Sequence, residues 1–124
     1  MSDAPALILP EKSRSIGNDL RRRLGADKVK DDFPTITAYS VDASIYKLVP
    51  KAVVQAETED DIAATVAYAM AAGVPITPRA AGTNLTGSAV GAGIILDCGR
   101  MNRILDLNVE EKWARVQPGL NLTE

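Results

Sequence analysis

The amino-acid sequence predicts an α/β (α+β) fold, in which a small sheet contains a βαβ unit and carries flanking helices. The first observation is the order strand, capped helix, strand over residues 52–77. The second is a series of short apolar runs after residue 92, each bounded by turn residues. The 124 residues, 46% hydrophobic and 24% charged, suit one domain or one lobe of a larger domain.

The first 49 residues predict a helix followed by an irregular lead-in. Residues 13–24 are expected to be helical because Ile16, Leu20 and Leu24 recur every four residues, and Gly25 is a plausible stop. The polar stretch that follows is expected to be irregular. Residues 35–48 carry Ser and Asp and predict turns, with their tyrosines anchored on an apolar surface.

The βαβ unit is the strongest structural signal. Residues 52–55 predict a short buried strand, and residues 74–77 predict a second. Between them Thr58 is a good N-cap, and three carboxylates follow it in the first turn, where the helix dipole favours negative charge. Gly73 is expected to end this helix. Strand, helix and strand in this order predict a parallel pair with a right-handed crossover.

Three more strands are expected at 93–97, 104–107 and 113–117, the last two as a hairpin closed by residues 108–112. Residues 120–124 resemble the start of a further helix. We therefore interpret residues 50–124 as the first α/β lobe of a domain, truncated before a second lobe. The uncovered apolar face of such a lobe predicts a tendency to self-associate.

The composition of the chain argues against several classes of function. The formal net charge of −2 disfavours nucleic acid as a partner, because phosphate contacts need a basic surface. The chain has no histidine, which removes the commonest metal ligand, and we predict no metal site. Cys98, the one cysteine, is expected to fill apolar space. With neither a transmembrane segment nor a signal peptide in evidence, the sequence predicts a cytoplasmic protein.

The most informative segment for function is the loop of tiny and hydroxyl side chains at 78–88. Small side chains admit a ligand to the backbone, and successive N–H groups can form a concave anion site suited to a phosphate or pyrophosphate. Arg79 could supply charge or brace the loop. The spacing fits neither a Walker loop nor a Rossmann fingerprint. From the residues alone, a ligand loop and a plain surface loop remain equally open.

Residues 39–124 resemble the start of an FAD-binding domain of the vanillyl-alcohol oxidase / p-cresol methylhydroxylase (PCMH) type. More narrowly, they resemble bacterial FAD-linked 2-hydroxy-acid dehydrogenases of the glycolate and D-lactate kind, including large members with an iron–sulfur domain. Four stretches in order carry the resemblance, namely 39–46, 50–54, 78–87 and the pair 101–105 with 116–119.

The resemblance implies FAD as cofactor, with its pyrophosphate wrapped by the loop mainly through backbone N–H groups. The positions carried over are Pro78, Arg79, Ala80, Ala81, Gly82, Thr83, Asn84, Gly87, Ser88, Pro118 and Gly119. Ala80 and Ala81 stand where the family commonly has glycine, so either the loop uses negative φ there or FAD binds less tightly. Asp42, Ser44 and Tyr46 are expected to serve packing, with an approach to the adenine side of FAD as the alternative.

The resemblance further implies an FAD-dependent oxidoreductase that takes a hydride from a 2-hydroxy acid such as D-lactate, glycolate or 2-hydroxyglutarate. Electrons would pass to another carrier, such as iron–sulfur centres. Catalytic residues are expected beyond residue 124 and remain unknown, and the fragment alone is expected to be inactive. The alternatives are a non-catalytic phosphate-binding or interaction module and a flavoenzyme resembling UDP-sugar reductases.

Overall fold

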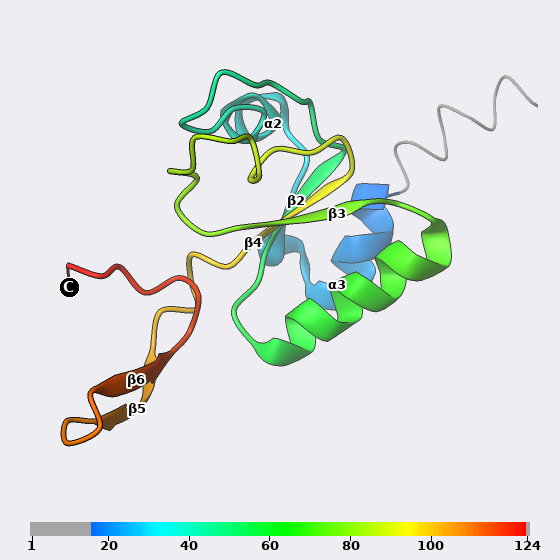
Figure 1. Cartoon of the computed structure of the whole chain (residues 1–124). Helices are drawn as coiled ribbons and strands as arrows, with labels where there is room; N and C mark the ends of the chain where they lie inside the picture. Colours follow the sequence, from blue (N-terminus) through cyan, green and yellow to red (C-terminus); the bar gives the residue numbers. More distant parts are fainter. Residues whose placement is uncertain (1–15, 124) are drawn as a thin grey trace, which may run out of the picture.

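The structure, a computed structural model, describes residues 16–123. It contains a four-stranded sheet in the order β1-β2-β4-β3 (Figure 1). The strands are β1 at Val29–Lys30, β2 at Ala52–Gln55, β3 at Ile76–Arg79 and β4 at Ile94–Asp97. β2 and β3 both run parallel to β4, whereas β1 is antiparallel to β2. The predicted α/β architecture is confirmed, with β4 as its central strand.

The βαβ unit forms as predicted, but its two strands are not neighbours. Helix α3 at Glu59–Ala72 connects β2 to β3, and β4 lies between the two strands. The Thr58 side chain accepts from the backbone N–H of Asp61, whose side chain reaches back to the Thr58 N–H in a capping box. Gly73 ends the helix in the left-handed region, with φ of 65°.

Two helices cover one face of the sheet. Helical residues 16–24 and α3 pack on the side chains of Val54, Ile94 and Leu96, which are almost fully buried. Residues 13–15 of the predicted first helix lie outside the described residues. Asp61 accepts from Lys28 Nζ at 3.0 Å, which ties the start of α3 to the short 3₁₀ helix η1 at Ala26–Lys28. These contacts fix the layer that supports the sheet.

Helix α2 at Phe33–Tyr39 and the loop after β3 lie on the other face of the sheet (Figure 1). Val53 and Ile95 point to this face and are fully buried. Helix α2 stands where the sequence predicted irregular chain and turns, and that prediction is wrong. Asp32 caps the helix by accepting from the Thr35 N–H, and Pro34 suits its first turn. β1 was also missed, since two residues are too few to show a period.

Several boundaries differ from the sequence predictions. β3 begins at Ile76, two residues later than predicted, and extends to Arg79. The helix expected after residue 119 does not form within the described residues, where the Asn121 side chain instead accepts from the backbone N–H of Thr123 at 3.1 Å. This local hydrogen bond makes a turn that competes with a helical start.

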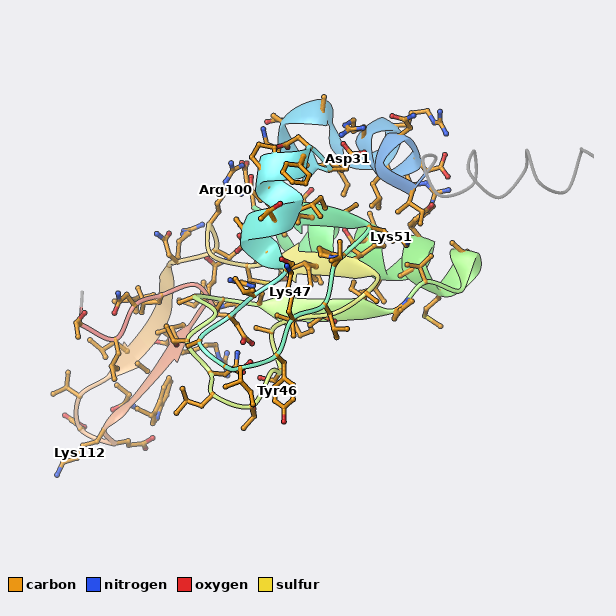
Figure 2. The ribbon with its side chains drawn as sticks, turned by 90° about the horizontal axis from the view of Figure 1, so that it is seen from above. Asp31, Tyr46, Lys47, Lys51, Arg100 and Lys112 are labelled. Atoms are coloured by element: carbon orange, nitrogen blue, oxygen red, sulfur yellow. The ribbon has the colours of Figure 1, made fainter. Side chains whose placement is uncertain are left out.

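The predicted hairpin is confirmed as β5 at Ile104–Asn108 and β6 at Trp113–Val116. Its two strands pair only with each other among the described strands, and it projects from the four-stranded sheet (Figure 1). Lys112 lies at its far tip (Figure 2). Apolar side chains stay exposed on it, including Ile104 at 60% and Leu107 at 62%. In the described part of the chain, no helix is long and apolar enough to cross a membrane.

Candidate functional site

The three parallel strands end side by side on polar residues. Gln55 of β2 and Arg79 of β3 are both in register with Asp97 of β4. Residues in register on parallel strands project on the same face, which here is the face covered by α2. Ligands of open α/β sheets bind outside the carboxyl ends of their strands. Of the segment 78–88 singled out from the sequence, Pro78 and Arg79 belong to β3, and the loop itself begins at this edge, directly after Arg79.

Arg79 braces the loop, which is one of the two roles left open for it. Its Nη1 donates to the backbone oxygen of Val41 at 2.8 Å and to that of Tyr39 at 3.4 Å. Its guanidinium also stacks on the Tyr39 ring, 5.0 Å from the ring centroid. The cation is thereby fixed at the mouth of the loop, where it still lines a hollow of about 210 Å³ with Gly82 and Asn84.

The backbone of the loop presents a run of free donors. The N–H groups of residues 80–84 donate no hydrogen bond to any residue that the structure describes. Beside them lies a hollow of about 520 Å³, lined on the loop side by Ala80, Ala81 and Thr83. Unpaired backbone N–H groups need a partner, and successive ones form a site for an anion. The arrangement suits the pyrophosphate of a dinucleotide.

Two glycines take the backbone angles that other residues avoid. Gly82 has φ of 70° and Gly87 has φ of 78°. Lys112 is the one non-glycine residue between positions 16 and 123 with a positive φ, so Ala80 and Ala81 turn without entering that region. The replacement of glycine by alanine at these two positions therefore puts no alanine in the left-handed region.

Asp42 holds the far side of the loop. One of its oxygens accepts from the Ser44 N–H at 2.9 Å and from the Ser44 hydroxyl, and the other accepts from Asn84 Nδ2 at 3.0 Å. Asn84 Oδ1 in turn accepts from the N–H groups of Thr86 and Ser88. Asn84 and the Ser88 amide are thus used to shape the loop, whereas the backbone N–H of Asn84 remains free.

The hydrogen bonds to Asp42 predict a loop that loosens in acid. The Ser44 hydroxyl, followed by the Ser44 N–H and Asn84, lowers the pKa of Asp42 from 3.8 to about 2. Because the folded form has the lower pKa, this stabilisation is complete above about pH 4 and is lost as the pH falls toward 2. We expect the urea midpoint to fall more steeply over this range in the wild type than in Asp42→Asn. Glu110→Gln, in the exposed hairpin turn, should behave as the wild type, and parallel curves for all three would contradict the prediction.

The opposite wall of the larger hollow comes from Gly99 and the turn at Pro118 and Gly119. The Gly119 N–H donates to the Met101 oxygen at 2.8 Å. A Cβ added at Gly119 would lie 2.3 Å from the Cys98 oxygen and 2.7 Å from the Gly99 oxygen. The turn therefore lies directly against the backbone that follows β4, and only glycine fits there. Cys98 is buried, as expected for an apolar filler.

The structure gathers the predicted site residues around three hollows. Ala80, Ala81, Thr83, Pro118 and Gly119 line the largest, and Pro78, Arg79, Gly82, Asn84 and Ser88 line the 210 Å³ hollow, together with Ala80, Ala81 and Thr83. Gly87 lines a third of about 330 Å³ with Tyr46, whose side chain is 55% exposed and points outward in Figure 2. Tyr39, Asp97 and Gly99 were given no site role from the sequence. Asp97 could have been found, because it is a polar residue at the end of a predicted strand.

Comparison with known proteins supports the same interpretation. Residues 50–124 match the family model described as FAD binding domain. D-2-hydroxyglutarate dehydrogenase from Pseudomonas putida is 38% identical over 121 residues, which cover 94% of this chain and 12% of that protein. Glycolate oxidase subunit GlcD from Bacillus subtilis is 33% identical over 112 residues, which cover 85% of this chain and 24% of that protein.

The fold agrees with these matches. The crystal structure of p-cresol methylhydroxylase superposes with a TM-score of 0.74 at 23% identity, over 89% of this chain and 23% of that one. The chain thus spans 12% to 24% of the length of these relatives. The family match extends over more than half of the chain and includes the loop, the free amides and the turn that form the hollow. The chain belongs to the FAD-binding domain family of flavoproteins, and its cofactor is FAD.

Proposed function

We propose that this chain holds the pyrophosphate of FAD in the hollow between residues 80–84 and the turn at residues 118–119. The observation that carries the proposal is the run of N–H groups at 80–84 without partners among the described residues, beside a hollow of about 520 Å³. Backbone donors fixed before binding capture an anion with little reorganisation. Arg79 adds a positive charge at the mouth of the loop.

We further propose that the full-length protein oxidises a 2-hydroxy acid. The named relatives are dehydrogenases or oxidases of such acids, with D-2-hydroxyglutarate dehydrogenase 38% identical to this chain. FAD supplies a two-electron acceptor when bound, and oxidation to the 2-oxo acid removes a hydride from C2 and a proton from the hydroxyl. The role of this chain is to bind and orient the cofactor, and the catalytic residues stay unassigned.

The electron acceptor and the location remain predictions. The chain has one cysteine, so ligands for an iron–sulfur centre would have to come from outside it. A cytoplasmic location is consistent with a cysteine that is buried and unpaired. Self-association of the isolated chain is supported by the exposed apolar side chains on the hairpin.

The test is flavin binding and substrate oxidation by the full-length protein. We expect it to purify with flavin absorbance, and the apoprotein to regain FAD in a fluorescence titration. D-2-hydroxyglutarate, D-lactate and glycolate are then offered with an artificial dye as electron acceptor. FAD binding without oxidation of any 2-hydroxy acid would favour the non-catalytic module, and absence of FAD binding would overturn the site itself.

A further inference from the structure

We propose that Tyr39 and Asp97 form a positioning pair that fixes the two walls of the larger hollow relative to each other. The pair thereby sets the affinity for the pyrophosphate of FAD. This inference rests on the FAD site proposed above and adds two residues to it that do not line the hollow themselves.

Tyr39 supports the wall formed by the loop. Its ring lies beneath the Arg79 guanidinium, 5.0 Å from ring centroid to Cζ, and its backbone oxygen accepts from Arg79 Nη1. Arg79 is the last residue of β3, and the free N–H groups begin one residue later. A displacement of the Tyr39 ring would therefore move the arginine from which the loop starts.

Asp97 supports the opposite wall. Its Oδ1 accepts from the Gly99 N–H at 2.7 Å, and Gly99 lines the hollow. The Gly99 oxygen lies against Gly119, so the position of Gly99 also decides where the turn at Pro118 and Gly119 can pack. Asp97 thus fixes the position of Gly99 and, through Gly99, the position of the second wall.

One carboxylate joins the two walls. While Oδ1 of Asp97 accepts from Gly99, its Oδ2 accepts from the Tyr39 hydroxyl. Gln55 Nε2 donates to the same hydroxyl from the other side at 3.4 Å, and Gln55 Oε1 is held by Arg100, which lies where the chain leaves the sheet (Figure 2). The two carboxylate oxygens each accept a charge-assisted hydrogen bond from one wall, whereas an amide in this place would present an acceptor oxygen to only one of the two walls.

The protonation state of Tyr39 suits its role as a hydrogen-bond donor to Asp97. Burial, and donation to the Asp97 carboxylate, raise the pKa of Tyr39 above 10.0. The hydroxyl therefore keeps its proton at neutral pH and remains a donor to Asp97. The pair stays intact over the range in which the protein would work.

The chain contains a second stack of the same kind that does not line any of the three hollows. The Tyr68 hydroxyl on α3 donates to Asp19 at 3.2 Å, and the Arg23 guanidinium lies 4.8 Å from the Tyr68 ring centroid. Tyr68 is buried against the helices on the opposite face of the sheet. Tyr68→Phe removes the same hydroxyl from the same Arg–Tyr–Asp arrangement and is the matched control for Tyr39→Phe.

The experiment compares these two variants in the full-length apoprotein. FAD affinity is measured by fluorescence titration, and urea unfolding of the apoprotein reports any purely structural loss. We expect Tyr39→Phe to weaken FAD and ADP by the same factor, about tenfold, because both ligands carry the pyrophosphate. Riboflavin, which has no phosphate, should change by less than about twofold, and Tyr68→Phe should change FAD affinity by less than about twofold.

A second variant keeps the proposal testable. Asp97→Asn should weaken FAD at least as much as Tyr39→Phe, and the double variant should lose no more than Asp97→Asn alone. Unchanged FAD affinity in Tyr39→Phe, or an equal loss in Tyr68→Phe, would overturn the positioning role while leaving the FAD site intact. A wild-type protein that binds no FAD would overturn both proposals.

Discussion

Gly119→Ala is expected to lower the FAD affinity of the full-length protein by about 10- to 100-fold. The added Cβ would lie 2.3 Å from the Cys98 oxygen and 2.7 Å from the Gly99 oxygen, and both atoms belong to the backbone after the central strand. Since this backbone cannot rotate away as a side chain can, the turn must move outward. That movement breaks the 2.8 Å hydrogen bond from the Gly119 N–H to Met101 and opens one wall of the hollow.

The measurement is an FAD titration of the apoprotein, with urea unfolding in parallel. Thr123→Ala is the control because Thr123 is exposed in the same segment and does not line the hollow. It should leave FAD affinity unchanged. If Gly119→Ala binds FAD as the wild type does, the turn at residues 118–119 is no part of the cofactor site.

Local signals in the sequence identified most of the elements of this fold. The N-cap at Thr58 and the stop at Gly73 bracket α3 within one residue, because capping depends on residues only three or four positions apart. The cap at Asp32 and the proline at residue 34 were signals of the same kind, and α2 could have been predicted from them. The parallel order of β2, α3 and β3 followed from general handedness and connection rules.

Contacts between segments far apart in the chain could not be predicted from such local signals. Arg79 donates to backbone oxygens 38 and 40 residues earlier in the chain, and no pattern near Arg79 distinguishes a bracing arginine from a ligand-binding one. The insertion of β4 between β2 and β3 is equally non-local. It is this insertion that places Asp97 between Gln55 and Arg79 and allows Asp97 to join the two walls.

The residue types of the loop predicted the kind of ligand better than the role of each side chain. Small residues and glycines predicted exposed backbone donors, and the structure has them at residues 80–84. The polar side chains of the loop do not all face a ligand, because the Asn84 side chain donates to Asp42 and accepts from two loop N–H groups. In a loop without regular hydrogen bonds, polar side chains are needed to shape the backbone.

Gly82→Ala is the second variant from which we expect a large effect, with FAD bound about tenfold more weakly. Gly82 has φ of 70°, where an L side chain is disfavoured by roughly 1–2 kcal/mol. Its added Cβ would also lie 2.6 Å from Arg79 Nη2 and 2.8 Å from Arg79 Cζ. The guanidinium must then shift, which disturbs its hydrogen bond to the Val41 oxygen and its stack on the Tyr39 ring and weakens the brace of the loop.

Gly73→Ala measures the stability cost of the backbone strain alone, because Gly73 has nearly the same φ, 65°, and nothing lies within 4 Å of its added Cβ. Both variants carry the backbone strain, but only Gly82→Ala displaces Arg79. We therefore expect similar falls in the urea midpoint for the two apoproteins and a loss of FAD affinity in Gly82→Ala alone. Equal FAD affinity in both would mean that the position of Arg79 is immaterial to the cofactor, and that the free N–H groups of residues 80–84 hold the pyrophosphate without it.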